Sequence, residues 1–299
     1  MENLWYKNAI IYAVDVDRFQ DATGDGCGDF VGLTNRLDYP TDLGVTCLLL
    51  LPVYPSRGRQ NGYELSDQRT TDPRLGTFDD FERFLHAAGE HSMRVIVDLV
   101  MDHTSDEHPW FQAARRSATS HYRDYYIWSD NPPPIPPGKG PMFPGQESTV
   151  WTYDEVASQY YYHRFYAFEP DLNPSNPDVQ EEIQRVIDFW LAFGVSGFRV
   201  DAANHLIEMP ETHRSEPERS HGILRRMREV TYAHKPDAVL LGEADEPPEQ
   251  LTTFFGDDDQ LHMLFNFVLN NYLFLALARQ ESTPIAHALR RLPHPPSTG

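Results

Sequence analysis

Charged side chains follow several apolar runs of the sequence, at the points where those runs end. Asp98 and His103 follow one run, Arg199 and Asp201 lie two residues apart at the end of a second, and Glu243 follows a third. Residues two apart in a strand point to the same face, so Arg199 and Asp201 would project together. Two carboxylates from neighbouring strands suit glycosidic-bond chemistry, in which a pair about 5 to 5.5 Å apart divides the nucleophile and acid roles of retaining enzymes. The alternative for each single acid is that it holds a loop or caps a helix.

The apolar runs that carry these residues are short and rich in β-branched and aliphatic side chains. They cover residues 9–16, 45–53, 94–100, 194–200 and 238–244, and a sixth candidate covers residues 261–268. Runs without polar alternation, separated by helical patterns, indicate parallel strands that are buried on both faces. The sequence therefore predicts an α/β fold, either a barrel or an open doubly wound sheet.

Two helices are predicted between these strands. Residues 77–91 open with a Thr cap and repeat aromatic side chains along one helical face. Residues 176–194 start at Asn176 with Pro177 in the first turn and end at Gly194.

The interval from residue 104 to residue 171 breaks this rhythm. It is too long for a loop between a strand and a helix, and it contains a Pro-rich run and many aromatic side chains. We interpret it as a small subdomain inserted after the third strand. The predicted organisation is therefore a first part of the main domain at 1–103, the insert at 104–171 and a second part at 172–299.

Composition argues against several classes of function. The chain has 299 residues, of which 40% are hydrophobic, enough for one large domain or two small ones. Its formal net charge of −20 argues against a nucleic-acid partner, which would need a basic patch. No apolar stretch approaches the roughly 18 to 20 residues of a membrane span. Cys27 and Cys47 cannot make a disulfide framework, and no secretory leader is recognisable, so we expect a cytoplasmic protein.

Four ordered motifs carry a resemblance to a known family. They are DLVMDHTSDEHPWF (98–111), EPDLN (169–173), GFRVDA (197–202) and LLGEAD (240–245). Together they resemble the signature regions of glycoside hydrolase family 13, the α-amylase family. Residues 3–45 and 61–81 are similar to its branch of oligo-1,6-glucosidases and trehalose synthases, and residues 247–293 resemble the trehalose synthases most.

The resemblance implies the fold and the roles of the strand-end residues. The fold would be a (β/α)₈ TIM barrel, incomplete here at about six of its eight strands, with a small subdomain inserted after strand 3. Asp201 would be the nucleophile that forms a covalent glucosyl intermediate, and Glu243 would be the acid and base. Arg199 would keep Asp201 ionised, because a nearby cation favours the carboxylate form.

The resemblance also implies how a sugar would be held. His103 would donate to a sugar hydroxyl, Tyr63 would stack on the ring of the first glucose, and Phe165 would help to wall that pocket. The alternative for Tyr63 and Phe165 is that they are ordinary core aromatics.

A Gly-rich loop at residues 21–29 places oxygen donors at alternating positions. The side chains of Asp21, Thr23, Asp25 and Asp29 and the carbonyl of Cys27 could surround a hard cation. The loop resembles the calcium loop of this branch, although Thr23 stands where the family usually has Asn or Asp. The alternative is a solvated acidic turn.

A second metal site is implied by some relatives. Its ligands would be the side chains of Asp102, Asp171 and Glu208 and the carbonyls of His205 and Leu206. Calcium, in a structural role, is the ion expected in this family.

Three positions depart from the family pattern. Gln60 stands where an Asp usually shapes the pocket for the non-reducing end, Glu169 stands where Gln is usual, and Asp102 replaces the common Asn. The departures concern sugar specificity, and they leave the pair of Asp201 and Glu243 in place.

The family's fourth signature, which carries a third catalytic Asp after the seventh strand, would follow the last residues of this chain.

Two hypotheses for the function therefore stand. In the first, the protein is a retaining enzyme on small α-glucosides such as maltose, trehalose, sucrose or short oligosaccharides. It would act either as a trehalose synthase-like isomerase through glucosyl transfer or as an α-glucosidase. In the second, it is a truncated, non-catalytic relative. We expect the 299-residue chain to be inactive alone and to self-associate through the open barrel edge.

Overall fold

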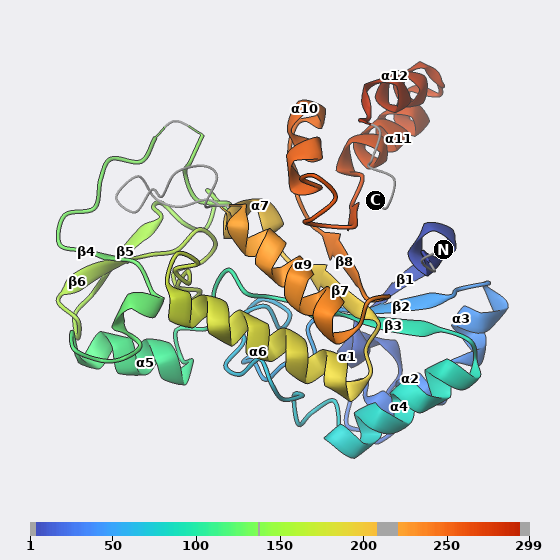
Figure 1. Cartoon of the computed structure of the whole chain (residues 1–299), viewed down its shortest axis with the longest axis horizontal. Coiled ribbons are helices and arrows are strands. Elements are labelled where there is room, and N and C mark those ends of the chain that lie inside the picture. The colour runs from blue at the N-terminus through green and yellow to red at the C-terminus, as the bar shows by residue number, and fades with distance from the viewer. Residues whose placement is uncertain (1–3, 137, 208–220, 294–299) are drawn as a thin grey trace.

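The main sheet of the protein has six strands, all parallel to their neighbours, in the order β1-β2-β3-β7-β8-β9. The structure is a computed structural model that describes residues 4–136, 138–207 and 221–293. The strands are β1 Ile11–Val14, β2 Cys47–Leu50, β3 Arg94–Leu99, β7 Gly197–Val200, β8 Val239–Gly242 and β9 Met263–Leu264. Helices follow the strands; α2, α4, α6 and α9 lie along the outer side of the sheet, while α11 and α12 stand away from it (Figure 1). This confirms the α/β prediction and gives an incomplete (β/α)₈ barrel.

Each predicted apolar run contains a strand, but the sixth is much shorter than predicted. Only Met263–Leu264 pairs with β8, and residues from Phe267 onward belong to helix α11 (Phe267–Arg279). The side chain of Asn266 accepts a hydrogen bond from the backbone N–H of Leu269 at 2.9 Å, so it caps the helix there. The prediction of a strand over 261–268 is therefore wrong for its second half.

Both predicted helices form as expected. Helix α4 (Phe78–Glu90) begins with a capping box, in which Thr77 and Asp80 satisfy each other's backbone N–H groups. Helix α6 (Pro177–Phe193) is capped by Asn176 and ends at Gly194 in the left-handed conformation. Their aromatic side chains meet in the core, where the rings of Phe81 and Trp190 lie edge to face, 5.4 Å apart.

The other helices are short except for α9, which has 13 residues. They are η1 Trp5–Asn8, α1 Val16–Phe19, α2 Phe30–Thr34, α3 Asp38–Asp42, α5 Pro109–Arg116, η2 Arg123–Tyr125, α7 Ala203–Leu206, α9 Gly222–His234, α10 Pro248–Leu251, η4 Thr252–Phe254 and α12 Thr283–Arg291. No helix in the described ranges combines the length and apolarity needed to cross a membrane.

A second, smaller sheet lies at the opposite end of the molecule from helix α3 (Figure 1). It is antiparallel, in the order β4-β6-β5, with strands β4 Trp128–Ser129, β5 Trp151–Asp154 and β6 Gln159–Tyr162. All three strands lie between β3 and β7 in the sequence, within the predicted insert. The domain boundaries at 103, 104, 171 and 172 stay predictions.

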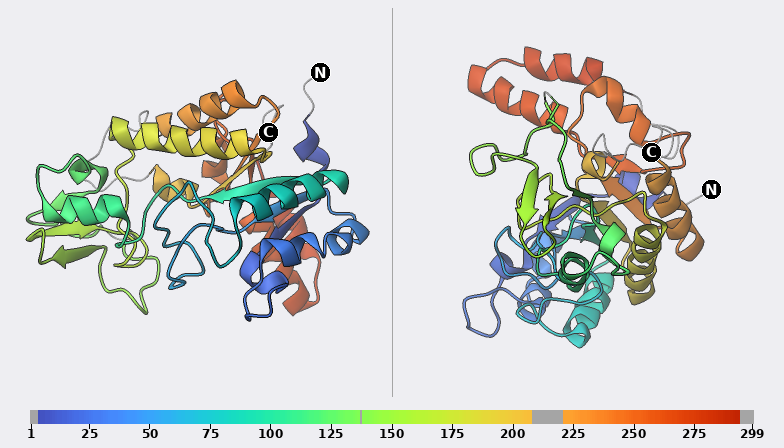
Figure 2. Two further views of the ribbon diagram at one scale, coloured as in Figure 1. Left: turned by 90° about the horizontal axis from the view of Figure 1, so that it is seen from below. Right: turned by 90° about the vertical axis from the view of Figure 1, so that its left-hand side faces the viewer.

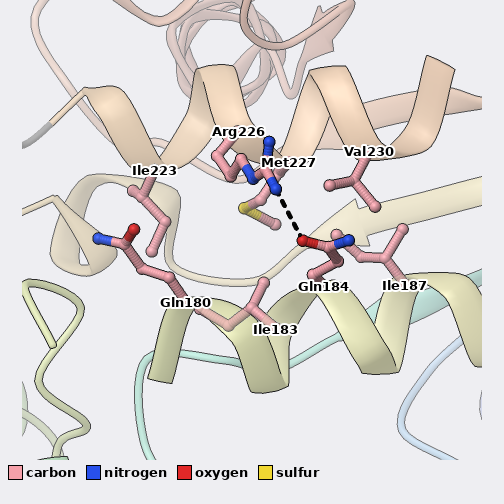
Figure 3. A pocket seen from close by; sticks show the side chains of 8 residues that line it. All are labelled: Gln180, Ile183, Gln184, Ile187, Ile223, Arg226, Met227 and Val230. Carbon is pink, nitrogen blue, oxygen red and sulfur yellow. Dashed lines mark hydrogen bonds between the residues drawn. The ribbon is translucent and has the colours of Figure 1, made fainter. Parts of the chain in front are cut away.

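Helices α6 and α9 run side by side across the outer face of the sheet (Figures 1 and 2). Ile183, Ile187, Ile223 and Met227 line the hollow between them, and Arg226 donates to Gln184 at 2.9 Å (Figure 3). The hollow has a volume of about 10 Å³. That is at most room for one water, so it is a packing gap between helices and no ligand site.

Candidate active site

Strands β3, β7 and β8 lie side by side and bring their charged ends to the same edge of the sheet. Asp98 of β3 is the register partner of Arg199 of β7. Beyond the strand ends, the backbone N–H of Asp201 donates to Leu99 at 3.1 Å, and that of Glu243 donates to Val200 at 3.0 Å. Side chains more than 40 residues apart in sequence are thereby held at neighbouring positions of one ladder.

The guanidinium of Arg199 lies at the centre of three carboxylates. Its Nη1 is 2.6 Å from Asp98 Oδ1 and 2.7 Å from Asp201 Oδ1, and its Nη2 donates to Glu243 Oε2. The sequence placed Asp98 at a strand end but gave it no role. Its signal in the sequence was a carboxylate that follows three aliphatic residues of the strand, but its distance to Arg199 depends on the strand register.

Burial raises the pKa of Asp201 well above its usual value, the charges of Asp98 and Glu243 add to the effect, and Arg199 opposes it. Burial likewise raises the pKa of Asp98 to about 6 against the opposing effect of Arg199. The predicted contact between Arg199 and Asp201 is present. Arg199 lowers the pKa of Asp201, which is the direction expected, but burial has the larger and opposite effect, so the ionised state of Asp201 stays a prediction.

Tyr63 joins a long loop to the acid cluster. Its hydroxyl donates to Asp98 Oδ2 at 3.0 Å and accepts from Arg199 at 3.1 Å, while its ring lies 5.6 Å from the Arg199 guanidinium carbon. Gly62, just before it, has a φ of 95°, a conformation that suits glycine. Tyr63 is half-buried beside the cluster, which is where a ring that stacks on a sugar would be needed.

His103 lies against the same loop with both ring nitrogens in use. Its Nδ1 is 2.9 Å from Asp102 Oδ2, and its Nε2 is 3.1 Å from the carbonyl oxygen of Tyr63. Burial alone would lower the pKa of His103, but the carboxylates of Asp102 and Glu169 raise it well above its usual value. A donation from His103 to a sugar would therefore have to replace its contact with Tyr63.

Phe165 packs between two histidines. Its ring centroid lies 5.4 Å from that of His103 and 5.5 Å from that of His205. The structure thus brings Phe165, His103 and Tyr63 together on one side of the acid cluster.

A profile of the α-amylase catalytic domain matches residues 11–289. The chain belongs to the α-amylase family. Trehalose synthase/amylase TreS of Mycolicibacterium smegmatis is 42% identical to it over 298 residues, which are 98% of this chain and 50% of that protein. The oligo-1,6-glucosidase of Parageobacillus thermoglucosidasius is 37% identical over 291 residues, which are 89% and 50% of the two chains.

Solved structures agree with this assignment to the α-amylase family. A variant of trehalulose synthase MutB superposes with a TM-score of 0.81 at 34% identity, covering 95% of this chain and 55% of that one. Trehalose-6-phosphate hydrolase TreA of Bacillus licheniformis gives 0.79 at 31% identity, with 89% and 50% covered. This α-amylase family chain therefore spans about half the length of the relatives it matches.

In this α-amylase family chain, the predicted calcium loop satisfies its oxygens internally. Asp21 accepts hydrogen bonds from the backbone N–H groups of Thr23, Gly24 and Gly26, and those from Gly26 and Gly24 lower its pKa. Asp25 accepts from Cys27 at 2.8 Å. Asp29 caps α2 by accepting from Gly32 at 2.7 Å.

Oxygen donors of this kind suit calcium chemically. Across the described residues, however, no three His, Cys, Asp or Glu side chains converge as a metal site would require. The calcium loop stays a prediction.

The second predicted metal site is only partly described. Asp102 Oδ1 is buried and has no hydrogen-bond partner among the described residues, a position that would fit a cation. Asp171 accepts a hydrogen bond from the backbone N–H of Arg164 at 2.9 Å, and burial raises its pKa well above the usual value, with Asp102 adding to the effect. The carbonyl of His205 accepts from Ile207, Leu206 ends helix α7, and Glu208 lies outside the described residues.

Proposed function

We propose that the chain is part of a retaining enzyme that acts on small α-glucosides, of the trehalose synthase type. The observation that carries the proposal is the group of three carboxylates around Arg199 at one edge of the parallel sheet. The α-amylase family match and the similarity to TreS support it.

In the proposed mechanism, Asp201 attacks the anomeric carbon of the bound glucosyl group, and the bond to the leaving oxygen breaks. Glu243 gives its proton to that oxygen, and the resulting carboxylate then takes a proton from the acceptor hydroxyl that attacks the covalent intermediate. Arg199 holds both carboxylates in place and balances their charge. Tyr63, Phe165 and His103 form the wall against which the sugar packs.

A trapping experiment tests the nucleophile without requiring full turnover. The 299-residue chain is incubated with an activated glucosyl fluoride whose glucosyl-enzyme form breaks down slowly. The masses of the intact protein and of its proteolytic peptides are then measured by mass spectrometry. We expect one glucosyl adduct, on the peptide that contains Asp201. The Asp201→Asn variant should form none, because its nearly isosteric amide cannot attack. Adduct formation on the variant, or none on the wild type, would contradict the proposal.

Glu243→Gln serves as the companion variant. Fluoride leaves with little protonation, so this variant should still form the adduct. Poor leaving groups need a proton from an acid, so their release should be lost. Equal losses with both kinds of leaving group would argue against the acid role of Glu243.

The acceptor decides between isomerisation and hydrolysis. Transfer to the released glucose interconverts maltose and trehalose, whereas transfer to water gives free glucose. We infer isomerisation, because TreS is the trehalose synthase to which the chain is 42% identical. Product analysis from maltose with a longer form of the protein separates the two, since trehalose forms only in the first case.

We also propose that the 299-residue chain alone self-associates and turns over little substrate. In the described residues, β1 and β9 each pair on one side only, so both present an open edge. Ile10 is 56% exposed beside β1, and Leu277 of α11 is 75% exposed. Light scattering checks this, because a monodisperse, active monomer would overturn it.

A further inference from the structure

The backbone carbonyl of Asp98 points toward β2. Along β3, the N–H of Arg94 donates to Thr46, just before β2, at 2.9 Å. The carbonyl of Val95 accepts from Ser196, just before β7, at 2.6 Å. Because the backbone groups of successive strand residues point to opposite sides, the even-numbered residues of β3 bond toward β2 and the odd-numbered ones toward β7.

The donor for this carbonyl on the β2 side would have to come from a proline. The register pairs Leu50 with Val97, and one further step along it places Leu51 opposite Asp98. In a parallel ladder of this sense, a carbonyl accepts from the residue that follows its partner, which for Asp98 is Pro52. Proline has no backbone N–H, so the ladder itself cannot satisfy the carbonyl, and a buried carbonyl without a partner is costly.

Tyr54 supplies the missing donor. Its hydroxyl donates to the carbonyl oxygen of Asp98 at 2.5 Å, across 44 residues of sequence. Tyr54 is only 2% exposed, and its ring lies edge to face with that of Trp190 of α6, with the centroids 5.7 Å apart. Burial raises the pKa of Tyr54 well above its usual value, and the charge of Asp98 adds to the effect. The hydroxyl therefore keeps its proton and stays a donor.

The residue that Tyr54 holds by its backbone also carries a carboxylate of the acid cluster. Asp98 Oδ1 lies 2.6 Å from Arg199 Nη1, and Asp98 Oδ2 accepts from the Tyr63 hydroxyl at 3.0 Å. A shift at the end of β3 would change both contacts. Through Arg199 it would also move the guanidinium that lies 2.7 Å from Asp201.

We propose that Tyr54 is a positioning residue, whose hydroxyl replaces the missing backbone donor of Pro52 and fixes Asp98 within the acid cluster. The consequence for catalysis rests on the proposed function, because it needs the cluster to form the glucosyl adduct. The consequence for the end of β3 is measurable without a substrate.

Hydrogen exchange tests the effect of the hydroxyl on β3. Tyr54→Phe keeps the ring and removes only the hydroxyl. The amide of Asp201, which donates to Leu99 at the end of β3, should then exchange roughly tenfold faster. The amide of Ser196, at the other end of the ladder between β3 and β7, should keep its wild-type rate. Residue-resolved NMR measures both rates. Equal acceleration of the two amides would indicate a general loss of stability and would overturn the inference, as would no acceleration of either.

Tyr161→Phe is the matched control. The Tyr161 hydroxyl also donates to a backbone carbonyl, that of Ala167, at 2.6 Å. Tyr161 is likewise buried, but it lies in β6 of the inserted subdomain. This variant removes the same kind of hydrogen bond, so it should leave the ratio of the two exchange rates as in the wild type.

The rate of glucosyl adduct formation tests the consequence for catalysis. At a saturating concentration of the glucosyl fluoride, Tyr54→Phe should form the adduct roughly tenfold more slowly than the wild type, because small displacements of reacting groups are costly. The concentration that gives half the maximal rate should change little, since the buried Tyr54 cannot itself touch the sugar. Tyr161→Phe should keep the wild-type rate. A wild-type rate in Tyr54→Phe would contradict the positioning role.

A second substitution restores the donor. Pro52→Ala, added to Tyr54→Phe, places a backbone N–H where the ladder lacks one. Both the exchange rate of Asp201 and the adduct rate should then return toward those of the wild type. A folded double variant that recovers neither would overturn the role given to the hydroxyl.

The outcomes separate this inference from the proposed function. If the wild type forms no adduct but exchange at Asp201 is selectively faster in Tyr54→Phe, the glucoside function is overturned while the dependence of β3 on Tyr54 stands. If the wild type forms the adduct and exchange at Asp201 is not selectively faster in the variant, the positioning role is overturned and the function stands.

Discussion

Arg199 Nη1 lies 2.7 Å from Asp201 Oδ1, and each residue is only 6% exposed. The same nitrogen is 2.5 Å from Asp98 Oδ2, so a single cation serves neighbouring carboxylates that have little access to water. A buried charge is tolerable only with such a partner. Arg199 is therefore needed both for the stability of this edge of the sheet and for the chemistry proposed there.

Replacing Arg199 by Met should strongly destabilise the fold. The apolar side chain keeps much of the volume but leaves three carboxylates without their cation, and breaking a buried pair in this way costs about 3 to 5 kcal/mol. Urea denaturation of both proteins measures the difference in the free energy of unfolding. The matched control is Arg226→Met on α9, whose side chain is 52% exposed, and which should change stability by less than about 1 kcal/mol. Similar effects at both positions would refute the proposed dependence on Arg199.

Asp98 should make stability depend on pH in a definite direction. Burial raises its pKa to about 6 from the ordinary 3.8, so between these values the folded state holds a proton that the unfolded state has lost. Stability falls with pH where the folded state binds more protons. From pH 4 to pH 6, the free energy of unfolding of the wild type should thus fall by up to about 3 kcal/mol relative to that of Asp98→Asn. The fall is about 1.4 kcal/mol per pH unit.

The measurement is a series of urea titrations at pH 4, 5, 6 and 7. Leu99→Val, a substitution at the next residue that titrates nothing, is the control, and its difference from the wild type should be the same at every pH. A constant difference between the wild type and Asp98→Asn would contradict the raised pKa.

The sequence predicted the strands well where apolar runs are uniform and poorly where polar capping intervenes. Five runs contain their strands, but the sixth breaks at Asn266, whose side chain accepts from Leu269 and starts a helix. Hydropathy does not reveal that hydrogen bond. Likewise, the spacing of Arg199 and Asp201 predicted their contact. Only the register between β3 and β7 could reveal that Asp98 shares the same guanidinium.

Glycines at two positions should respond in opposite ways to alanine. Gly197 in β7 has a φ of 140°, and a Cβ there would lie 2.1 Å from the carbonyl oxygen of Val239. Gly197→Ala must therefore push β7 and β8 apart, at a cost of about 3 kcal/mol or more.

Gly89, in α4, has nothing within 4 Å of an added Cβ. Gly89→Ala should stabilise the protein by about 0.5 to 1 kcal/mol. Thermal melting of both variants checks whether the melting temperature falls for Gly197→Ala and rises for Gly89→Ala. A lower melting temperature for Gly89→Ala would disprove the prediction for that position.

The loop from Asp21 to Asp29 provides the last prediction, which concerns calcium. Asp21 is partly exposed, and its backbone hydrogen bonds lower its pKa, so it stays anionic and accessible to a cation. If the folded loop binds calcium and the unfolded chain does not, mass action raises stability by about 2.7 kcal/mol at a hundredfold excess over the dissociation constant. The metal-stripped chain should therefore melt at a higher temperature when calcium is added.

Asp25→Ala should abolish that rise, because it removes one carboxylate from the middle of the loop. Asp38→Ala removes an equally exposed acid from α3, outside the loop, and should leave the rise intact. The pair of variants separates specific binding from general screening of the net charge of −20, since screening would respond alike to both losses. If the wild type melts at the same temperature with and without calcium, the loop is a solvated acidic turn whose carboxylates serve its own backbone.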